Sequence, residues 1–336
     1  MRQLLFMRKL LFMRQLLFMR QLLLSALILL SAIICGCATN AASAQEYFSI
    51  GMAYFELGKY EEAEKWLNRA KQYDRTMTAS QYNLGRLAFE RQRYGEAARL
   101  FEDILKKDPD NVLALRAAAY TRIKTGDINI AQRHYSRLLE LVPESADDGY
   151  NHALVLYAME RYDEAELVME KYRYSLRDNK EMFLLYARTQ NAQNKVEAID
   201  SYSNWLAEYS DPRARYEYAL ALERHELYAR ALEEYRKAIS EITSPTGDIK
   251  KSDVRFALAR VLLIADSESA EGITEMQNAV EEGFSDIAAI EELIESGKVT
   301  GANAGSLGNI VSGMRRTEEE RIEEEAAEEN AMETDI

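Results

Sequence analysis

Residues 44–77 read AQEYFSIGMAYFELGKYEEAEKWLNRAKQYDRTM, and residues 78–111 read TASQYNLGRLAFERQRYGEAARLFEDILKKDPDN. The two stretches carry the same residue types in the same places, with glycine at Gly51 and Gly85 and, further on, a tyrosine, an alanine and a large apolar residue. Two antiparallel helices need small residues where their backbones approach and large ones in the groove beside them. The pattern therefore predicts a repeated pair of helices.

The same phase continues along the chain through units 112–145, 146–179, 180–211 and 212–245, of which 180–211 is two residues short. The prolines agree with it: Pro109 and Pro143 are 34 residues apart, and Pro212 and Pro245 fall at unit junctions, where a missing N–H costs little. The pattern resembles the tetratricopeptide repeat (TPR) family. The resemblance implies an all-α fold, a right-handed α-solenoid of about six to seven helix pairs that share a continuous core.

The C-terminal part departs from this pattern. Residues 246–296 are expected to hold a degenerate seventh repeat and a capping helix that begins after Ser285 as its N-cap. Residues 318–335 contain ten acidic residues and one arginine, a composition typical of a solvated or disordered tail with some local helix. We expect residues 297–336 to form a Gly-rich hinge and a disordered acidic tail, because glycines recur where a core would have to form, at Gly297, Gly301, Gly305, Gly308 and Gly313.

The N-terminus repeats a basic and apolar hexapeptide with methionines at Met1, Met7, Met13 and Met19, and Met19 already begins a sufficient export signal. An uncleaved membrane helix is the alternative, but the apolar run Leu22–Ile34 is shorter than the ~20 residues that span a bilayer. We therefore expect a signal peptide over residues 1–36 and a linker over residues 37–43.

The segment Ile34-Cys35-Gly36-Cys37 resembles the bacterial lipobox, which implies that Cys37 is lipidated and becomes the new N-terminus. The covalent lipid would anchor the protein to a membrane, and no other cofactor or metal is expected. By the same resemblance, Ala38 in place of aspartate favours the periplasmic face of the outer membrane. Without the first 36 residues, 37 basic and 56 acidic residues remain, a balance that argues against a nucleic-acid partner.

In the TPR family, the concave face is lined from the first helix of each unit. The resemblance therefore implies a partner-binding groove at Phe48, Phe55, Tyr82, Arg86, Phe89, Arg116, Tyr120, Tyr150, Tyr157, Arg188 and Tyr216. Tyr82, Tyr150 and Tyr216 have an alternative role in packing between units, whereas Phe55, Phe89 and Tyr157 are the better groove candidates.

Arg86, Arg116 and Lys124 would form a positive cluster that holds a carboxylate, unless Glu56 and Glu90 neutralise it.

The sequence carries no phosphate loop, no HExxH motif and no thiol nucleophile in its body, so we do not expect an enzyme. The predicted function is that of a membrane-anchored scaffold or adaptor lipoprotein that binds other envelope proteins or their peptides. The alternative is a periplasmic ligand-binding lipoprotein that works with a transport system. Fold analogy does not decide between them.

Overall fold

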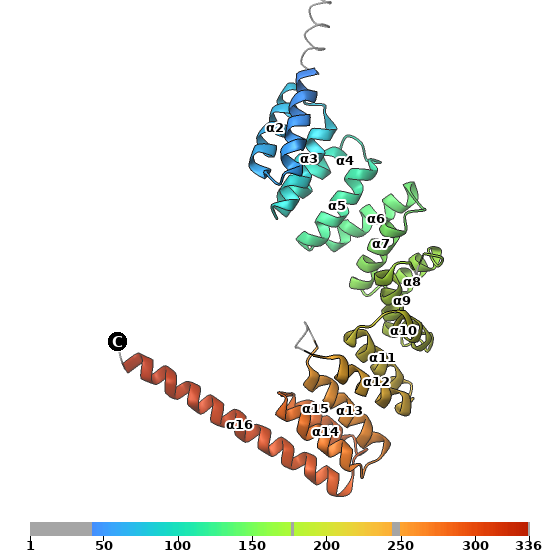
Figure 1. Cartoon of the computed structure of the whole chain (residues 1–336), viewed down its shortest axis with the longest axis vertical. Helices are drawn as coiled ribbons and strands as arrows, with labels where there is room; N and C mark the ends of the chain where they lie inside the picture. Colours follow the sequence, from blue (N-terminus) through green and yellow to red (C-terminus); the bar gives the residue numbers. More distant parts are fainter. Residues whose placement is uncertain (1–41, 176–177, 244–248, 335–336) are drawn as a thin grey trace, which may run out of the picture. The chain divides into compact units, whose positions relative to one another are not determined.

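The computed structural model describes residues 42–175, 178–243 and 249–334. This part of the chain is helical and contains no β-strand, which confirms the all-α fold class (Figure 1). It divides into two compact units, an N-terminal unit up to Met159 and a C-terminal unit from Glu160. The expected signal peptide, Cys37 and most of the linker after it lie outside the described residues.

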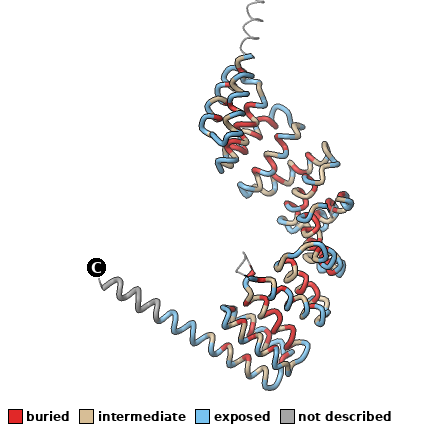
Figure 2. Tube along the Cα trace, viewed as in Figure 1, coloured by how far each residue is buried: buried red, intermediate tan, exposed pale blue. Residues whose placement is uncertain are grey.

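The N-terminal unit is a row of helices, each packed against the next. A helix over residues 42–56 is followed by α2 (Tyr60–Tyr73), α3 (Thr78–Glu90), α4 (Tyr94–Leu105), α5 (Val112–Thr125), α6 (Ile128–Leu141) and α7 (Ala146–Ala158). Polar side chains start several of these helices, as Asn111 and Ser145 accept hydrogen bonds from the backbone N–H groups of Ala114 and Asp148. Buried residues recur along the helix faces (Figure 2).

The core of each pair consists of the small and large residues that define the repeat. A Cβ atom on Gly85 would lie 2.6 Å from the ring of Phe101, and one on Gly51 would lie 2.9 Å from the side chain of Leu67. Glycine is therefore required for the two helices to approach this closely. The alanines and large apolar residues in these places are also at most 1% exposed, among them Ala63, Ala97, Ala119, Ala131 and Tyr135.

The turn between the two helices of each expected repeat contains one residue in the left-handed conformation. Its φ lies between 57° and 81° in every case, at Gly58, Gln92, Gly126, Glu160, Asn194 and Glu226. The spacing locates the two residues missing from unit 180–211. In unit 78–111, Ala97 follows the turn residue Gln92 by five positions, whereas in unit 180–211 Ala198 follows Asn194 by four. Likewise, the first residue of the next unit, Val112, follows Phe101 by eleven positions, whereas Pro212 follows Tyr202 by ten. One residue is lost between Asn194 and Ala198, at the start of the second helix, and one is lost after that helix.

The C-terminal unit comprises α8 (Tyr162–Lys171), α9 (Lys180–Ala192), α10 (Glu197–Glu208), α11 (Pro212–Arg224), α12 (Tyr228–Glu241), α13 (Lys251–Ala265), α14 (Ala270–Glu281), α15 (Ile287–Glu295) and α16 (Gly301–Thr334). Helices α13 and α14 pack as a further pair, in which a Cβ on Gly272 would meet Leu263 at 2.7 Å. The closing helix α15 begins one residue later than expected, because Asp286 rather than Ser285 caps it through the N–H of Ala289.

The expected Gly-rich hinge over residues 297–336 is wrong for its described part. Residues 301–334 form one helix, α16, which packs on α14 and α15 (Figure 1). Leu307 is fully buried and Val311 is 5% exposed, in a cluster with Phe256, Met276 and Leu293. Burial of these apolar side chains offsets the weak helix propensity of Gly305, Gly308 and Gly313, which costs about 1 kcal/mol per glycine.

Candidate protein-binding site

Four of the predicted groove residues come together in the N-terminal unit. The guanidinium of Arg86 on α3 lies 4.8 Å from the ring centre of Phe55, a cation–π contact with the first helix (residues 42–56). The ring centres of Phe89 on α3 and Tyr120 on α5 lie 5.4 Å apart, and the rings of Phe89 and Tyr94 meet in a T-shaped arrangement with centres 5.1 Å apart. These residues form a continuous aromatic surface on consecutive helix pairs.

A small cavity opens into this surface. It has a volume of about 170 Å³, and Arg86, Phe89, Glu90, Ala117 and Tyr120 belong to its lining, with Phe101 and Thr121 beneath them. Tyr120 is 44% exposed, so its ring is available to a partner. The cavity has room for one apolar side chain beside a cationic group, a combination typical of protein interfaces.

The charges at the site differ from the expected three-cation cluster. Within the described residues, Arg86 and Lys124 have no carboxylate partner: Arg86 donates to the side-chain oxygen of Asn83, and Lys124 lies 5.7 Å from the ring centre of Tyr120. Neither Glu56 nor Glu90 neutralises them by an ion pair. Arg86 and Lys124 therefore remain available to an anionic group of a partner.

Arg116 does not belong to this cluster, because it is paired with a buried carboxylate. Its guanidinium donates two hydrogen bonds to Asp148 on α7, at 2.7 and 2.6 Å, and the Asp148 side chain is only 1% exposed. Burial raises the pKa of Asp148, but the hydrogen bonds and charge of Arg116 outweigh burial, and the pKa lies below its ordinary value. The role of Arg116 is therefore structural, because its ion pair with Asp148 links α5 to α7.

The other predicted aromatic residues of the N-terminal unit are partly buried. Tyr82 packs on Phe101 with ring centres 5.6 Å apart, and both Tyr82 and Phe89 lie against the apolar core of the unit. Phe48, Tyr150 and Tyr157 lie on the first helix and on α7, and none of them lines the cavity. Phe89 thus has two roles, in the core and at the surface.

Two predicted groove residues lie in the C-terminal unit and take part in internal contacts. Arg188 on α9 donates to both carboxylate oxygens of Glu217 on α11, at 2.7 and 3.0 Å. Tyr216 packs on Tyr235 with ring centres 5.9 Å apart, and burial raises the pKa of its hydroxyl. Arg188 therefore connects two neighbouring helix pairs, whereas Tyr216 packs within the pair of α11 and α12.

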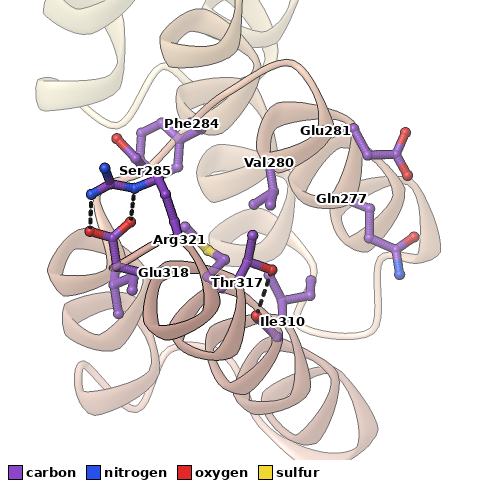
Figure 3. Close-up of a pocket in the computed structure, with 12 residues that line it drawn as sticks. Gln277, Val280, Glu281, Phe284, Ser285, Ile310, Thr317, Glu318 and Arg321 are labelled. Atoms are coloured by element: carbon purple, nitrogen blue, oxygen red, sulfur yellow. Dashed lines mark hydrogen bonds and ion pairs between the residues drawn. The ribbon is translucent and has the colours of Figure 1, made fainter. Parts of the chain in front are cut away.

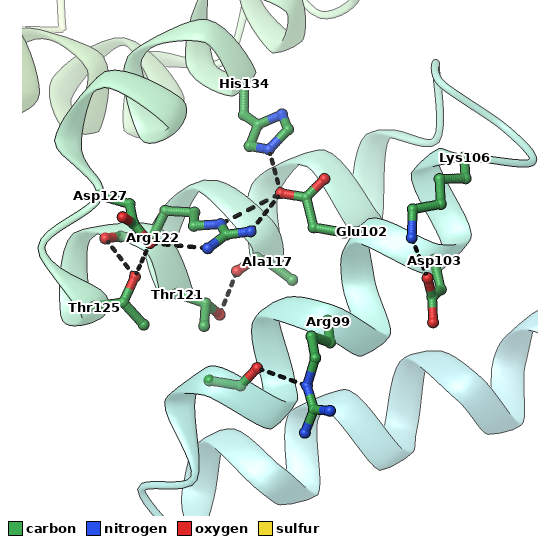
Figure 4. A network of polar contacts seen from close by, with 11 residues as sticks. Arg99, Glu102, Asp103, Lys106, Ala117, Thr121, Arg122, Thr125, Asp127 and His134 are labelled. Carbon is green, nitrogen blue, oxygen red and sulfur yellow. Dashed lines mark hydrogen bonds and ion pairs between the residues drawn. The ribbon is translucent and has the colours of Figure 1, made fainter.

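A polar network on α4, α5 and α6 was not predicted from the sequence. Glu102 accepts hydrogen bonds from Arg122 at 3.3 Å and lies 3.0 Å from His134, while Arg122 also donates to Asp127 at 2.8 Å (Figure 4). The residues come from three helices and meet only after folding, so no sequence spacing signals them. Arg122 bridges the carboxylates of Glu102 and Asp127, so the network joins neighbouring helices.

The described residues hold no group of three or more histidine, cysteine or acidic side chains that could bind a metal ion. No helix among them is both long and apolar enough to cross a membrane.

The stacked helix pairs and the aromatic surface define a helical repeat protein with a surface suited to binding other proteins. Sequence models of the tetratricopeptide repeat match residues 44–76, 88–151 and 188–247. The chain is a tetratricopeptide repeat protein. Such repeats indicate a scaffold for protein–protein interaction.

Relatives share parts of the chain. An uncharacterized lipoprotein of Treponema pallidum is 24% identical over 153 residues, which is 46% of this chain and 78% of the relative. The Hsp70-Hsp90 organizing protein 3 of Arabidopsis thaliana is 29% identical over 125 residues, 36% of this chain. The chain spans only 21% of that protein's length and 14% of a further curated relative.

Among solved structures, a tetratricopeptide repeat protein from Parabacteroides merdae has the same fold. It superposes with a TM-score of 0.52 at 19% identity, over 76% of this chain and 98% of that one.

Proposed function

We propose that this protein is a membrane-anchored adaptor lipoprotein of the bacterial cell envelope, which binds a segment of a partner protein through its N-terminal unit. The observation that carries the proposal is the cavity lined by Arg86, Phe89 and Tyr120, with Phe55 against Arg86 and Lys124 against Tyr120. An apolar side chain of the partner would enter the cavity, and a carboxylate would face Arg86 and Lys124.

The membrane anchor is proposed from the lipobox-like order of residues before Cys37. The similarity to an uncharacterized lipoprotein is consistent with it. Because Ala38 rather than aspartate follows Cys37, the proposed location is the periplasmic face of the outer membrane. A lipid anchor keeps the adaptor at this surface, since acyl chains contribute ~0.8 kcal/mol per buried methylene.

The test is site-specific photo-crosslinking in native cell envelopes. A photoreactive residue at Tyr120 should form a covalent adduct with one partner protein, whereas the same group at Arg133, exposed on α6, should not. Adding Arg86→Glu should abolish the Tyr120 adduct by repelling the partner's carboxylate. Equal adducts at both positions, or none in a fully expressed protein, would contradict the proposal. Absence of a protein adduct together with a higher melting temperature in the presence of small metabolites would favour the ligand-binding alternative.

A further inference from the structure

Helix α16 begins as part of the core and then presents exposed side chains up to Glu323. Leu307 and Val311 are buried, and Ile310 and Met314, on an adjoining face, are partly buried against the same cluster. From Thr317 to Glu323, every side chain is exposed. The apolar face of α16 therefore stops where the helix leaves the body of the C-terminal unit.

A large cleft lies at this point of departure. It has a volume of about 850 Å³ and is bounded by α14, the turn before α15, and α16 (Figure 3). Val280, Phe284, Ile310 and Met314 provide its apolar surface. Phe284 stacks on Phe256 with ring centres 4.3 Å apart, so this part of the surface is firmly packed. The cleft is several times larger than the cavity of the N-terminal unit, which is about 170 Å³.

The edge of the cleft is acidic. Glu281 is exposed and has no cationic partner among the described residues. Glu318 is paired with Arg321 one turn along the same helix, at 2.7 Å. The exposed residues Glu319, Glu320 and Glu323 continue the negative charge along α16, and residues 318–335 carry ten acidic residues and one arginine. Like charges in neighbouring turns destabilise an isolated helix, and a partner of opposite charge would remove that repulsion.

We propose that the cleft and the acidic stretch of α16 bind a basic amphipathic helix of a partner protein. Its apolar side chains cover Val280, Ile310 and Met314. Its lysines and arginines face Glu281 and the exposed carboxylates of Glu319, Glu320 and Glu323. The charge requirement is opposite to that of the N-terminal site, where Arg86 and Lys124 favour an anionic group. The two surfaces therefore select different partners, and the second does not depend on the first.

The experiment uses the full mature chain with Cys37→Ser and a designed helical peptide of about 20 residues, with leucines on one face and lysines on the other. Fluorescence anisotropy measures its affinity at low and physiological salt. Two control peptides are a scrambled one of the same composition and an amphipathic one with glutamate in place of lysine. We expect both controls to bind at least roughly tenfold more weakly than the amphipathic lysine peptide.

Two kinds of variant locate the binding site. Met314→Lys places a cation in the cleft, and Thr317→Trp fills the cleft from an exposed position that does not disturb the core. Both should weaken binding at least roughly tenfold. The triple reversal of Glu281, Glu319 and Glu320 to lysine should do the same, whereas reversal of the equally exposed Glu197, Asp200 and Glu208 on α10 should have little effect.

Several results would overturn the proposal. One is equal binding of the scrambled peptide, and another is equal loss on charge reversal at α10, since net charge alone would then explain binding. If folded Thr317→Trp binds the lysine peptide with unchanged affinity, the cleft is excluded as the binding site. This conclusion holds even if circular dichroism shows that Met314→Lys is unfolded. A dimer that dissociates in Thr317→Trp would show that a second copy of this chain occupies the cleft.

Discussion

Arg116 on α5 and Asp148 on α7 form a two-point ion pair, in which Nε and Nη2 of the arginine lie 2.7 and 2.6 Å from the two carboxylate oxygens. The aspartate side chain is 1% exposed and the arginine side chain is 44% exposed. One partner is thus buried, and the other reaches it from the surface of the neighbouring helix pair. This geometry makes Arg116 a structural residue, although its place in the repeat suggested partner binding.

Replacing Arg116 by alanine should destabilise the N-terminal unit. The buried carboxylate of Asp148 would lose its cation, at a cost of roughly 3 kcal/mol, the lower end for a broken buried pair because Arg116 is half exposed. Urea unfolding followed by circular dichroism measures this loss. Arg116→Lys, which keeps the charge but not the two-point geometry, should fall between wild type and alanine. An unchanged unfolding midpoint in Arg116→Ala would show that the pair contributes nothing.

The same pair predicts a dependence of stability on pH. The pKa of Asp148 is lowered in the folded state, so its ionised form stabilises the fold above the unfolded pKa of about 3.9, and this contribution is lost as the pH falls through the folded pKa. Asp148→Asn cannot ionise. The difference in unfolding free energy between wild type and Asp148→Asn should therefore be largest near neutral pH and should shrink below pH ~4. A difference that stays constant through this range would rule out the linkage.

Gly85→Ala should destabilise the N-terminal unit by about 1–3 kcal/mol, because the added Cβ would meet the buried ring of Phe101 at 2.6 Å. Gly95→Ala is the matched control, since a Cβ there meets no atom within 4 Å. The control should stabilise the protein by up to about 1 kcal/mol through helix propensity. Thermal unfolding of both variants gives the comparison. Equal effects at the two glycines would mean that close helix approach is not required at Gly85.

Leu307→Ala should cost about 3 kcal/mol, because Leu307 is fully buried in the core shared by α14, α15 and α16. Ile322→Ala, at a position 53% exposed on the same helix, should leave stability unchanged. A chain that ends after Thr317 should likewise melt at the same temperature as the full chain, whereas a chain that ends before Gly301 should melt at a lower temperature. If the two truncations melt alike, α16 does not contribute to the core.

Metabolic labelling with palmitate tests the proposed anchor. Cys37→Ser should abolish labelling, whereas Cys35→Ser should retain it, because only Cys37 follows an aliphatic residue and two small ones, Ile34, Cys35 and Gly36. A chain that starts at Met19 should still be labelled and exported. Equal labelling in wild type and Cys37→Ser would exclude this residue as the lipid site without affecting the proposed binding surfaces.

The repeat and its core could be predicted from the sequence. Gly51, Gly85, Ala97 and Tyr135 lie in the core because each pairs with a residue of the adjacent helix in the same short segment, so that the 34-residue phase alone places them. The exception within the repeats also has a local cause, since the shortened unit 180–211 lacks one residue at the start of its second helix and one after that helix.

Which polar and aromatic side chains remain available for binding was decided only by the tertiary structure. Arg116 is paired because Asp148, 32 positions later, is buried beside it, while Arg86 forms no ion pair among the described residues. Phe89 and Tyr82 turn partly into the core. Likewise, α16 forms part of the body because Leu307 and Val311 find an apolar surface on α14 and α15, which outweighs the glycines that locally disfavour a helix. Contacts within a helix pair recur with the sequence period, but charge pairing and burial between pairs depend on residues that only the fold brings together.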